Sequence, residues 1–122
     1  MSVGGDRKLL GRWGEDVVAR DLRSRGCTIL AAGWHCRWGE IDLVARDPGG
    51  VVCFVEVKTR SSRAIAPPRE AVTAAKRRKL RDAASWYLAQ TGWDGPCRFD
   101  VAEVYPAGAE GRRQIKYITN AF

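Results

Sequence analysis

The alternation of apolar and polar residues along the chain predicts two helices and four or more strands. Apolar residues recur at helical spacing over residues 8–25 and 69–90. Strand-like runs, several bounded by turn residues, lie at residues 27–30, 34–38, 41–46, 51–59, 98–104 and 114–118. This order of helix, strands, helix and strands predicts an α/β sandwich, in which a central mixed β-sheet is flanked by helices.

The strands at residues 41–46 and 51–59 are predicted to form a hairpin, because Asp47-Pro48-Gly49-Gly50 between them is strong turn chemistry. If the turn centres near Gly49, Asp42 falls directly opposite Glu56 and the two carboxylates share a face of the sheet. A slip of one residue would place them on opposite faces.

Glu56 and Lys58 end the apolar run of the second strand, and they point to the same side of it. Charges beside an apolar core are costly unless they are paired or used. Mg²⁺, which takes carboxylate oxygens, waters and phosphate as ligands, would use them, and Lys58 would position or help to deprotonate an attacking water. An ordinary salt bridge between Glu56 and Lys58 is the alternative, since so short a pattern often recurs by chance.

The first predicted helix carries an unusual carboxylate. Trp13 and Val17 share one apolar stripe, and Glu15 lies beside an adjacent stripe rather than on the wet side of the helix. A carboxylate in that position needs a partner. Gly26 is placed to end the helix.

The chain has 122 residues and a formal net charge of +7, which favours polyanionic partners. Arg60, Lys76, Arg77 and Lys79 are candidates for contacts with nucleic-acid phosphates, although a solvated helix face also explains the cations of the second helix. Trp34 and Trp38 are suited to stacking on unpaired bases, but core packing or a subunit contact explains them equally well.

Several classes of protein are disfavoured. We expect one domain over residues 1–122, with a core at about 8–104 and a C-terminal strand or tail at 105–122. No apolar run reaches the length of a membrane span, and the first residues lack a signal-peptide core, so we expect a cytoplasmic protein without a membrane partner. Four widely spaced cysteines fit reduced thiols. The single histidine, His35, is expected at the surface and argues against His-rich zinc chemistry.

Two further carboxylates have alternative roles. Glu40 lies two residues before Asp42 on the same face, where it would join the metal site or pair with Arg37 or Arg60. Asp100 lies between Phe99 and Val101, and we expect it to form a structural salt bridge with Arg98.

Taken together, the motifs resemble a known family. They are Gly14-Glu15, Gly39-Glu40-Ile41-Asp42-Leu43-Val44-Ala45, Phe54-Val55-Glu56-Val57-Lys58-Thr59-Arg60, Ala71-Val72 followed by Lys76, and Arg98-Phe99-Asp100-Val101. In this combination, over roughly residues 8–104, the chain resembles the YraN-like uncharacterised protein family. That family is similar to Holliday-junction resolvases and to the PD-(D/E)xK nuclease superfamily.

The resemblance implies a restriction-endonuclease-like sandwich and a Mg²⁺-dependent endonuclease, with Mn²⁺ as a substitute, that hydrolyses phosphodiester bonds of branched or damaged DNA. It implies that Asp42, Glu56 and the Val57 carbonyl are metal ligands, that Lys58 is the catalytic lysine, and that Glu15 is an outer or second-metal ligand. The chain departs from the superfamily pattern at Ile41, where the leading proline is absent, and in the loop at residues 61–68, where related sequences often carry glycine.

A second class of function stays open, in which a nucleic-acid-binding or partner-recruiting module has kept the acids but cleaves little by itself. DNA is the expected nucleic acid, because nothing in the chain resembles an RNA-binding signature. Cutting a branched junction needs two sites, which a two-fold homodimer would provide. Apolar residues at 92–96 and in the tail that ends at Phe122 are the candidates for such an interface.

Overall fold

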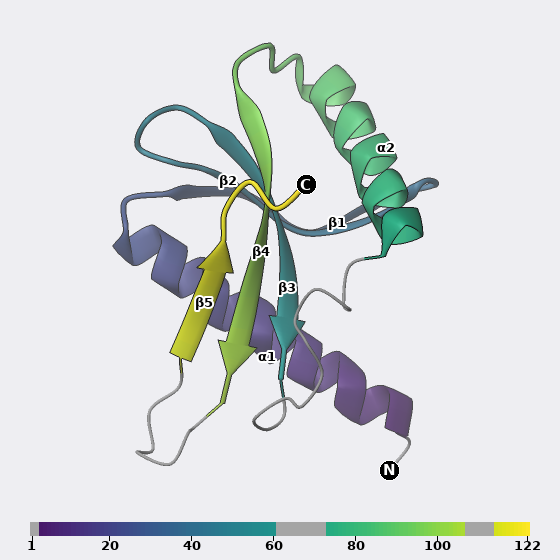
Figure 1. Ribbon diagram of the computed structural model, residues 1–122, viewed down its shortest axis with the longest axis vertical. Coiled ribbons are helices and arrows are strands. Elements are labelled where there is room, and N and C mark those ends of the chain that lie inside the picture. Colours follow the sequence, from purple (N-terminus) through teal and green to yellow (C-terminus); the bar gives the residue numbers. More distant parts are fainter. Residues whose placement is uncertain (1–2, 61–72, 107–113) are drawn as a thin grey trace.

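A computed structural model describes residues 3–60, 73–106 and 114–122, with the backbone alone for residues 3–10. Two helices and five strands follow one another along the chain (Figure 1). They are α1 (Val3–Ser24), β1 (Thr28–Cys36), β2 (Gly39–Arg46), β3 (Val52–Thr59), α2 (Ala74–Thr91), β4 (Cys97–Tyr105) and β5 (Gln114–Ile118).

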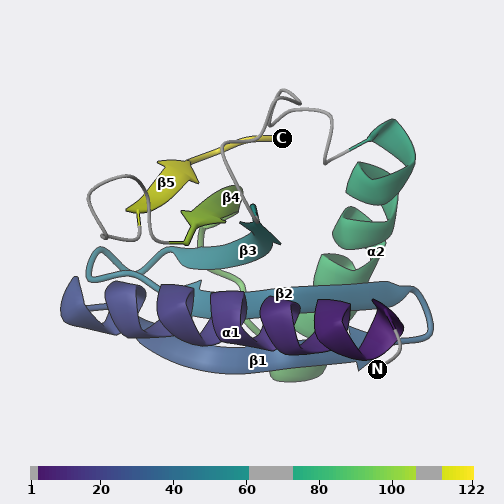
Figure 2. The same ribbon diagram turned by 90° about the horizontal axis from the view of Figure 1, so that it is seen from below.

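The five strands form one sheet in the order β1-β2-β3-β4-β5. All neighbours are antiparallel except β3 and β4, which are parallel and joined through α2. Figure 2 shows α1 extended along one face of the sheet, with α2 on the other side. The predicted α/β sandwich with a central mixed sheet is therefore confirmed, and its arrangement is consistent with a restriction-endonuclease-like fold.

Each helix covers its own apolar cluster. On the α1 side, Val17 and Val18 pack with Leu43, Val55 and Val104. On the α2 side, the cluster contains Ile41, Val44, Val52, Phe54, Ala83, Ala84 and Tyr87. Because β3 contributes to both clusters, it is buried on both faces, as its continuous apolar run predicts.

The end of α1 is as predicted, but one of its apolar residues is not. Gly26 has a φ of +89°, and the N–H of Cys27 donates to the carbonyl of Leu22 at 3.0 Å, which closes the helix. Trp13, expected on the apolar stripe, is 36% exposed. The next residue, Gly14, faces the sheet in its place, and its lack of a side chain lets the helix lie close to β3.

The contact at Gly14 gives a test with an internal control. A Cβ atom there would collide with Thr59 Oγ1 and would lie 3.4 Å from Val57 Cγ1, whereas a Cβ atom at Gly11 meets no described atom within 4 Å. We expect Gly11→Ala to raise the free energy of unfolding by about 0.5–1 kcal/mol through helix propensity. Gly14→Ala should lower it by about 1–2 kcal/mol, because overpacking outweighs the same gain. Urea unfolding of both variants checks this, and an equal stabilisation would contradict the close contact.

Two predicted segments, residues 27–30 and 34–38, largely coincide with the single strand β1, which ends at Cys36 so that residues 37 and 38 form the turn before β2. The register between β1 and β2 shifts between Ile29 and Ala31, which marks a bulge, and Gly33 has a φ of +62°. Alanines and glycine at 31–33 have low strand propensity, which is why the sequence suggested a break. Pairing with β2 overrides that propensity.

The described part of the second predicted helix begins later than residue 69. Thr73 caps α2 by accepting the N–H of Lys76 at 3.2 Å, and Gly92, with a φ of +71°, donates to the carbonyl of Leu88 at 2.9 Å. The predicted helix start at 69–72 and the predicted loop at 61–68 lie outside the described residues.

Candidate active site

The β2–β3 hairpin has the register that its turn predicted. The N–H of Asp47 donates to the carbonyl of Val51, and Asp47 Oδ1 accepts the N–H of Val51 at 2.9 Å. The paired residues run from Arg46 with Val52 to Leu43 with Val55. Continued by one residue, this register places Asp42 opposite Glu56, but the regular pairing ends before that pair.

The pairing ends because β2 is irregular at Asp42. Ile41 packs in the α2-side cluster and Leu43 in the α1-side cluster, although alternate residues of a regular strand share a face. Asp42 Oδ2 accepts the backbone N–H of Val57 at 2.8 Å, where a regular ladder would use a main-chain carbonyl. The N–H and C=O of one strand residue point to the same edge, so the Val57 carbonyl faces the edge at which Asp42 lies.

The carboxylates near this edge repel one another. Burial and the neighbouring charge of Glu56 raise the pKa of Asp42 to about 8. The hydrogen bond from the Val57 N–H lowers this pKa, but its effect is smaller. Burial also raises the pKa of Glu15 on α1, with smaller contributions from Glu40, Asp16 and Glu56. Glu15 is thus close enough to Glu40 and Glu56 to feel their negative charge, and a cation among these carboxylates would relieve the repulsion.

The raised pKa of Asp42 predicts how stability depends on pH. The folded protein binds the Asp42 proton more tightly than the unfolded chain, whose value is near 3.8, so stability falls as the pH rises from that value to about 8. We expect Asp42→Asn to remove this loss and to melt at a higher temperature than the parent protein at about pH 8 in EDTA. Thermal melts of both proteins between about pH 5 and about pH 9 measure the difference. A parent-minus-variant difference that is independent of pH would contradict the assignment.

Lys58 forms an ion pair with one carboxylate and lies beside a second in the sheet register. Its Nζ lies 3.2 Å from Glu56 Oε1, so the simple salt bridge considered from the sequence is present. In the parallel register Lys58 is also the neighbour of Glu103 on β4. Glu103 is fully buried, and its Oε2 lies 3.4 Å from Arg60 Nη2. Glu103 was not among the predicted site residues, and its signal was a second acid, after Asp100, within the largely apolar strand β4.

The donor set at this edge is small. Among the described residues, no three His, Cys, Asp or Glu side chains are grouped so as to hold a metal ion. The expected donors are the carboxylates of Asp42, Glu56 and Glu15 with the Val57 carbonyl, and these three carboxylates are not grouped in this way. Asp42, Glu56 and the Val57 carbonyl remain as the donors on β2 and β3. Oxygen donors of this kind, with water and phosphate completing the shell, suit Mg²⁺, and the mutual repulsion of the carboxylates favours a cation. The residues therefore fit such an ion.

The predicted phosphate-binding cations lie in different environments. Lys76 and Lys79 are exposed on α2. Arg77 is half-buried, with its guanidinium 5.5 Å from the centre of the Phe122 ring, and Arg60 pairs with Glu103. Arg77 thus has a structural contact that its position in a basic run did not indicate.

The aromatic and surface predictions are also resolved. Trp34 meets Tyr87 edge-on at 5.4 Å and belongs to the core, whereas Trp38 is exposed. His35 is at the surface, as expected. Glu40 is exposed and adds to the negative potential at Glu15 and Asp42, while Arg60, one of its two expected partners, pairs with Glu103.

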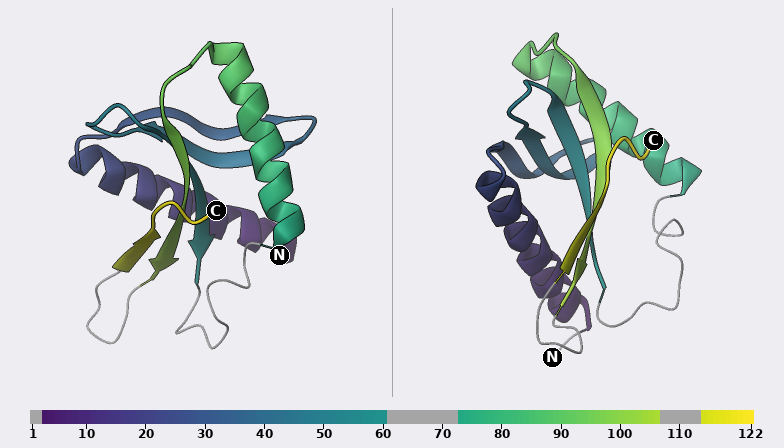
Figure 3. Two further views of the ribbon diagram at one scale, coloured as in Figure 1. Left: turned by 45° about the horizontal axis from the view of Figure 1, so that its top comes forward. Right: turned by 60° about the vertical axis from the view of Figure 1, so that its left-hand side comes forward.

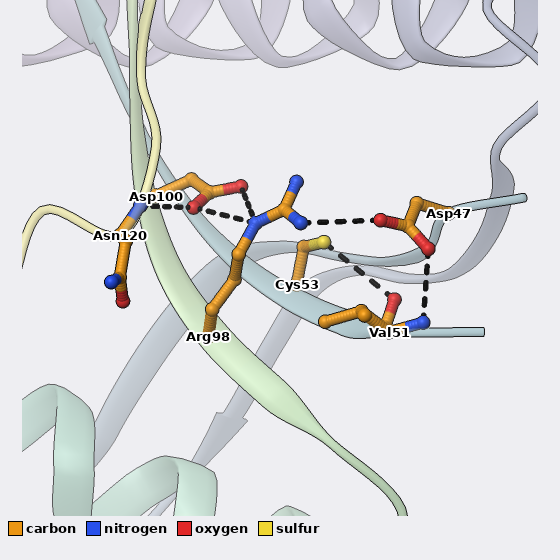
Figure 4. A network of polar contacts seen from close by, with 6 residues as sticks. All are labelled: Asp47, Val51, Cys53, Arg98, Asp100 and Asn120. Carbon is orange, nitrogen blue, oxygen red and sulfur yellow. Dashed lines mark hydrogen bonds and ion pairs between the residues drawn. The ribbon is translucent and has the colours of Figure 1, made fainter. Parts of the chain in front are cut away.

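Asp100 has the structural role predicted for it. Figure 4 shows the guanidinium of Arg98 between Asp100 and Asp47, with contacts of 3.0 Å to Asp100 Oδ2 and 3.1 Å to Asp47 Oδ2. Asp100 Oδ1 also accepts the backbone N–H of Asn120 at 2.8 Å. The network joins the β2–β3 turn, β4 and the C-terminal segment.

The apolar residues considered for a subunit interface pack within the chain. Phe122 stacks on Phe99 at 5.1 Å, and Phe99 stacks in turn on Phe54. Trp93 packs against the α2-side cluster and donates its indole N–H to the Pro96 carbonyl at 3.2 Å. Both segments therefore pack against the chain's own α2-side cluster.

Comparison with known proteins adds relatives over most of the chain. Residues 14–104 match the uncharacterised protein family UPF0102. A UPF0102 protein of Symbiobacterium thermophilum is 52% identical over 116 residues, covering 94% of this chain and 97% of the relative. A UPF0102 protein of Thermosynechococcus vestitus is 51% identical, covering 78% of this chain and 79% of the relative. A UPF0102 protein of Neisseria meningitidis is 39% identical, covering 90% of this chain and 91% of the relative. Of the helices described, neither is long and apolar enough to cross a membrane.

Proposed function

The chain belongs to the uncharacterised protein family UPF0102, and from its candidate active site we propose that it is a metal-dependent endonuclease that hydrolyses DNA phosphodiester bonds. One observation carries the proposal. At Asp42 the β2–β3 ladder is broken, and a carboxylate with a raised pKa, a second carboxylate and a lysine lie around a partly buried backbone edge. A purely structural hairpin would continue its ladder with apolar residues there.

Each residue has a role in this proposal. Asp42, Glu56 and the Val57 carbonyl would hold Mg²⁺. Glu15, whose charge raises the pKa of Asp42, would act as an outer or second-metal ligand. The ion would supply charge stabilisation at the phosphoryl oxygens and a lower pKa for a bound water. Lys58, already positioned by Glu56, would orient that water for attack. Arg60 and the exposed cations of α2 would position the DNA backbone.

The alternative of a binding module is disfavoured by the same carboxylates. Phosphates are repelled by a group of acids unless a cation lies between them, so a surface selected only for binding would carry cations at this edge. Here Asp42 and Glu56 lie at this edge, and Lys58 is paired with Glu56.

The test is cleavage of end-labelled duplex, single-stranded, flap and four-way-junction DNA by the full chain, with Mg²⁺, Mn²⁺ or EDTA. We expect cleavage only with a divalent ion and only by the parent protein, with Glu56→Gln inactive but folded. Branched substrates should be cut fastest. Salt-sensitive DNA binding that is the same for both proteins, with no cleavage of any substrate, would favour the binding module.

A further inference from the structure

Two tryptophans form an exposed aromatic pair outside the candidate active site. Trp38, at the tip of the β1–β2 hairpin, is 47% exposed, and Trp86 on α2 is 44% exposed. With Asp82 and Ser85 they line a hollow of about 310 Å³, near the lower limit for small-ligand sites. Figure 3 shows the end of the hairpin beside α2, and a Cβ atom at Gly39 would lie 3.7 Å from the Lys79 carbonyl oxygen.

Packing within the chain does not account for this pair. The other aromatic residues near α2 are covered, since Trp34 and Phe54 both meet Tyr87 edge-on within 6 Å. Trp38 and Trp86 instead leave nearly half of their surfaces in water. Clustered exposed indoles commonly mark a binding surface.

The charge around the hollow indicates the class of ligand. The Arg37 guanidinium lies 5.0 Å from the centre of the Trp38 ring. On α2, Arg78, Lys79 and Arg81 are exposed and lie within about one turn of Asp82. Four cations thus surround the two rings and a single acid. An apolar protein segment gains little from such a rim, whereas a nucleic acid needs both aromatic faces and cations.

We propose that Trp38 and Trp86 form a stacking site for one unpaired base of a DNA strand, and this proposal rests on the proposed function. Asp82 would accept a hydrogen bond from an exocyclic amino group, such as that of cytosine, and the surrounding cations would bind the flanking phosphates.

The site is close to the Asp42 edge. Gly39 and Asp42 are three strand residues apart, which is roughly 10 Å, or about three nucleotide steps of 3.4 Å. A DNA with an unpaired base a few nucleotides from the scissile bond therefore fits both sites, so the proposal assigns branched or partly single-stranded DNA as the substrate class.

Binding in EDTA tests the stacking site independently of cleavage. The probes are a fluorescein-labelled single-stranded oligocytidylate and an abasic strand of the same length and charge. Trp38→Ala and Trp86→Ala should each weaken binding of the oligocytidylate roughly 5- to 150-fold, corresponding to about 1–3 kcal/mol per stacked base, and should leave abasic-strand binding unchanged. Trp38→Phe should retain most of the affinity, and Leu30→Ala, which removes another exposed apolar side chain on β1, should retain all of it.

The parent protein offers a second measurement that needs no variant. Its tryptophan fluorescence should be quenched by the oligocytidylate and not by the abasic strand. Equal affinity of the tryptophan variants for the oligocytidylate, or an equal loss for both probes, would overturn the stacking site. A dimer that both alanine variants convert to a monomer without any base-dependent loss of binding would assign the pair to a subunit contact instead. Because no metal is present, absence of nuclease activity would leave this result unaffected.

Discussion

Replacement of Asp42 by asparagine should lower the rate of metal-dependent DNA cleavage by about a thousandfold, since the loss of one charged metal ligand removes several kcal/mol of charge stabilisation. The change is nearly isosteric, and the asparagine oxygen can still accept the N–H of Val57, so the backbone geometry should be kept. At the same time the metal-free variant should be more stable than the parent at about pH 8. Activity and stability would then move in opposite directions, as they do when a charge is retained for function.

A matched control for this experiment lies in the turn after α2. Asp94 is exposed, so Asp94→Asn removes the same charge at the surface and should alter neither cleavage nor stability measurably. Single-turnover rates on the preferred DNA, with circular dichroism to verify folding, are the measurement. Unchanged cleavage by a folded Asp42→Asn protein would show that the observed nuclease activity arises elsewhere and would end the proposal.

Asp100→Ala should have the largest effect on stability among the substitutions considered, lowering the free energy of unfolding by about 3–5 kcal/mol. It removes a buried carboxylate that accepts hydrogen bonds from Arg98 and from the backbone of Asn120, and so leaves Arg98 with Asp47 alone. For a domain of this size the melting temperature should fall by about 12–20 °C. Urea and thermal unfolding measure both quantities.

The same variant distinguishes structural from catalytic use of this aspartate. Cleavage per folded molecule at a low temperature should equal that of the parent protein, because the Asp100 carboxylate contacts Arg98 and the Asn120 backbone rather than the proposed metal ligands. In a double-mutant cycle with Arg98→Met, the two substitutions should show a coupling energy of at least about 1 kcal/mol. A loss of stability below about 1 kcal/mol would mean that solvent replaces the network and that the buried pair contributes little.

Much of the candidate site followed from short-range rules. The turn at Asp47–Gly50 determines the hairpin register, so the position of Asp42 relative to Glu56 could be derived by counting residues. The Arg98–Asp100 pair could also be predicted, since residues two apart on a strand share a face and opposite charges there meet. The end of α1 at Gly26 could be predicted because glycine readily adopts the positive φ with which many helices end.

Features that depend on distant contacts could not be derived in this way. The irregularity at Asp42, which turns its carboxylate toward the Val57 N–H, arises from packing of Ile41 and Leu43 on opposite sides of the sheet. Trp13 and Arg77 were misplaced because helical periodicity does not show where a glycine permits close approach or where the chain end returns. The sequence of α2 does not show that Trp86 lies beside Trp38, because this contact depends on where the β1–β2 hairpin packs.

The strand order has a consequence for how the protein folds. Sheet neighbours are also chain neighbours, and the longest connection between paired strands, from Thr59 to Cys97, contains α2. Glu15, Asp42, Glu56 and Lys58 all precede that connection. During synthesis, α1 and the β1–β2–β3 meander would emerge with these groups before β4 is available, and the parallel pairing of β3 with β4 would form late and slowly. The charged edge would thus be assembled by local pairing, and the last slow step would be burial of Glu103 beside it.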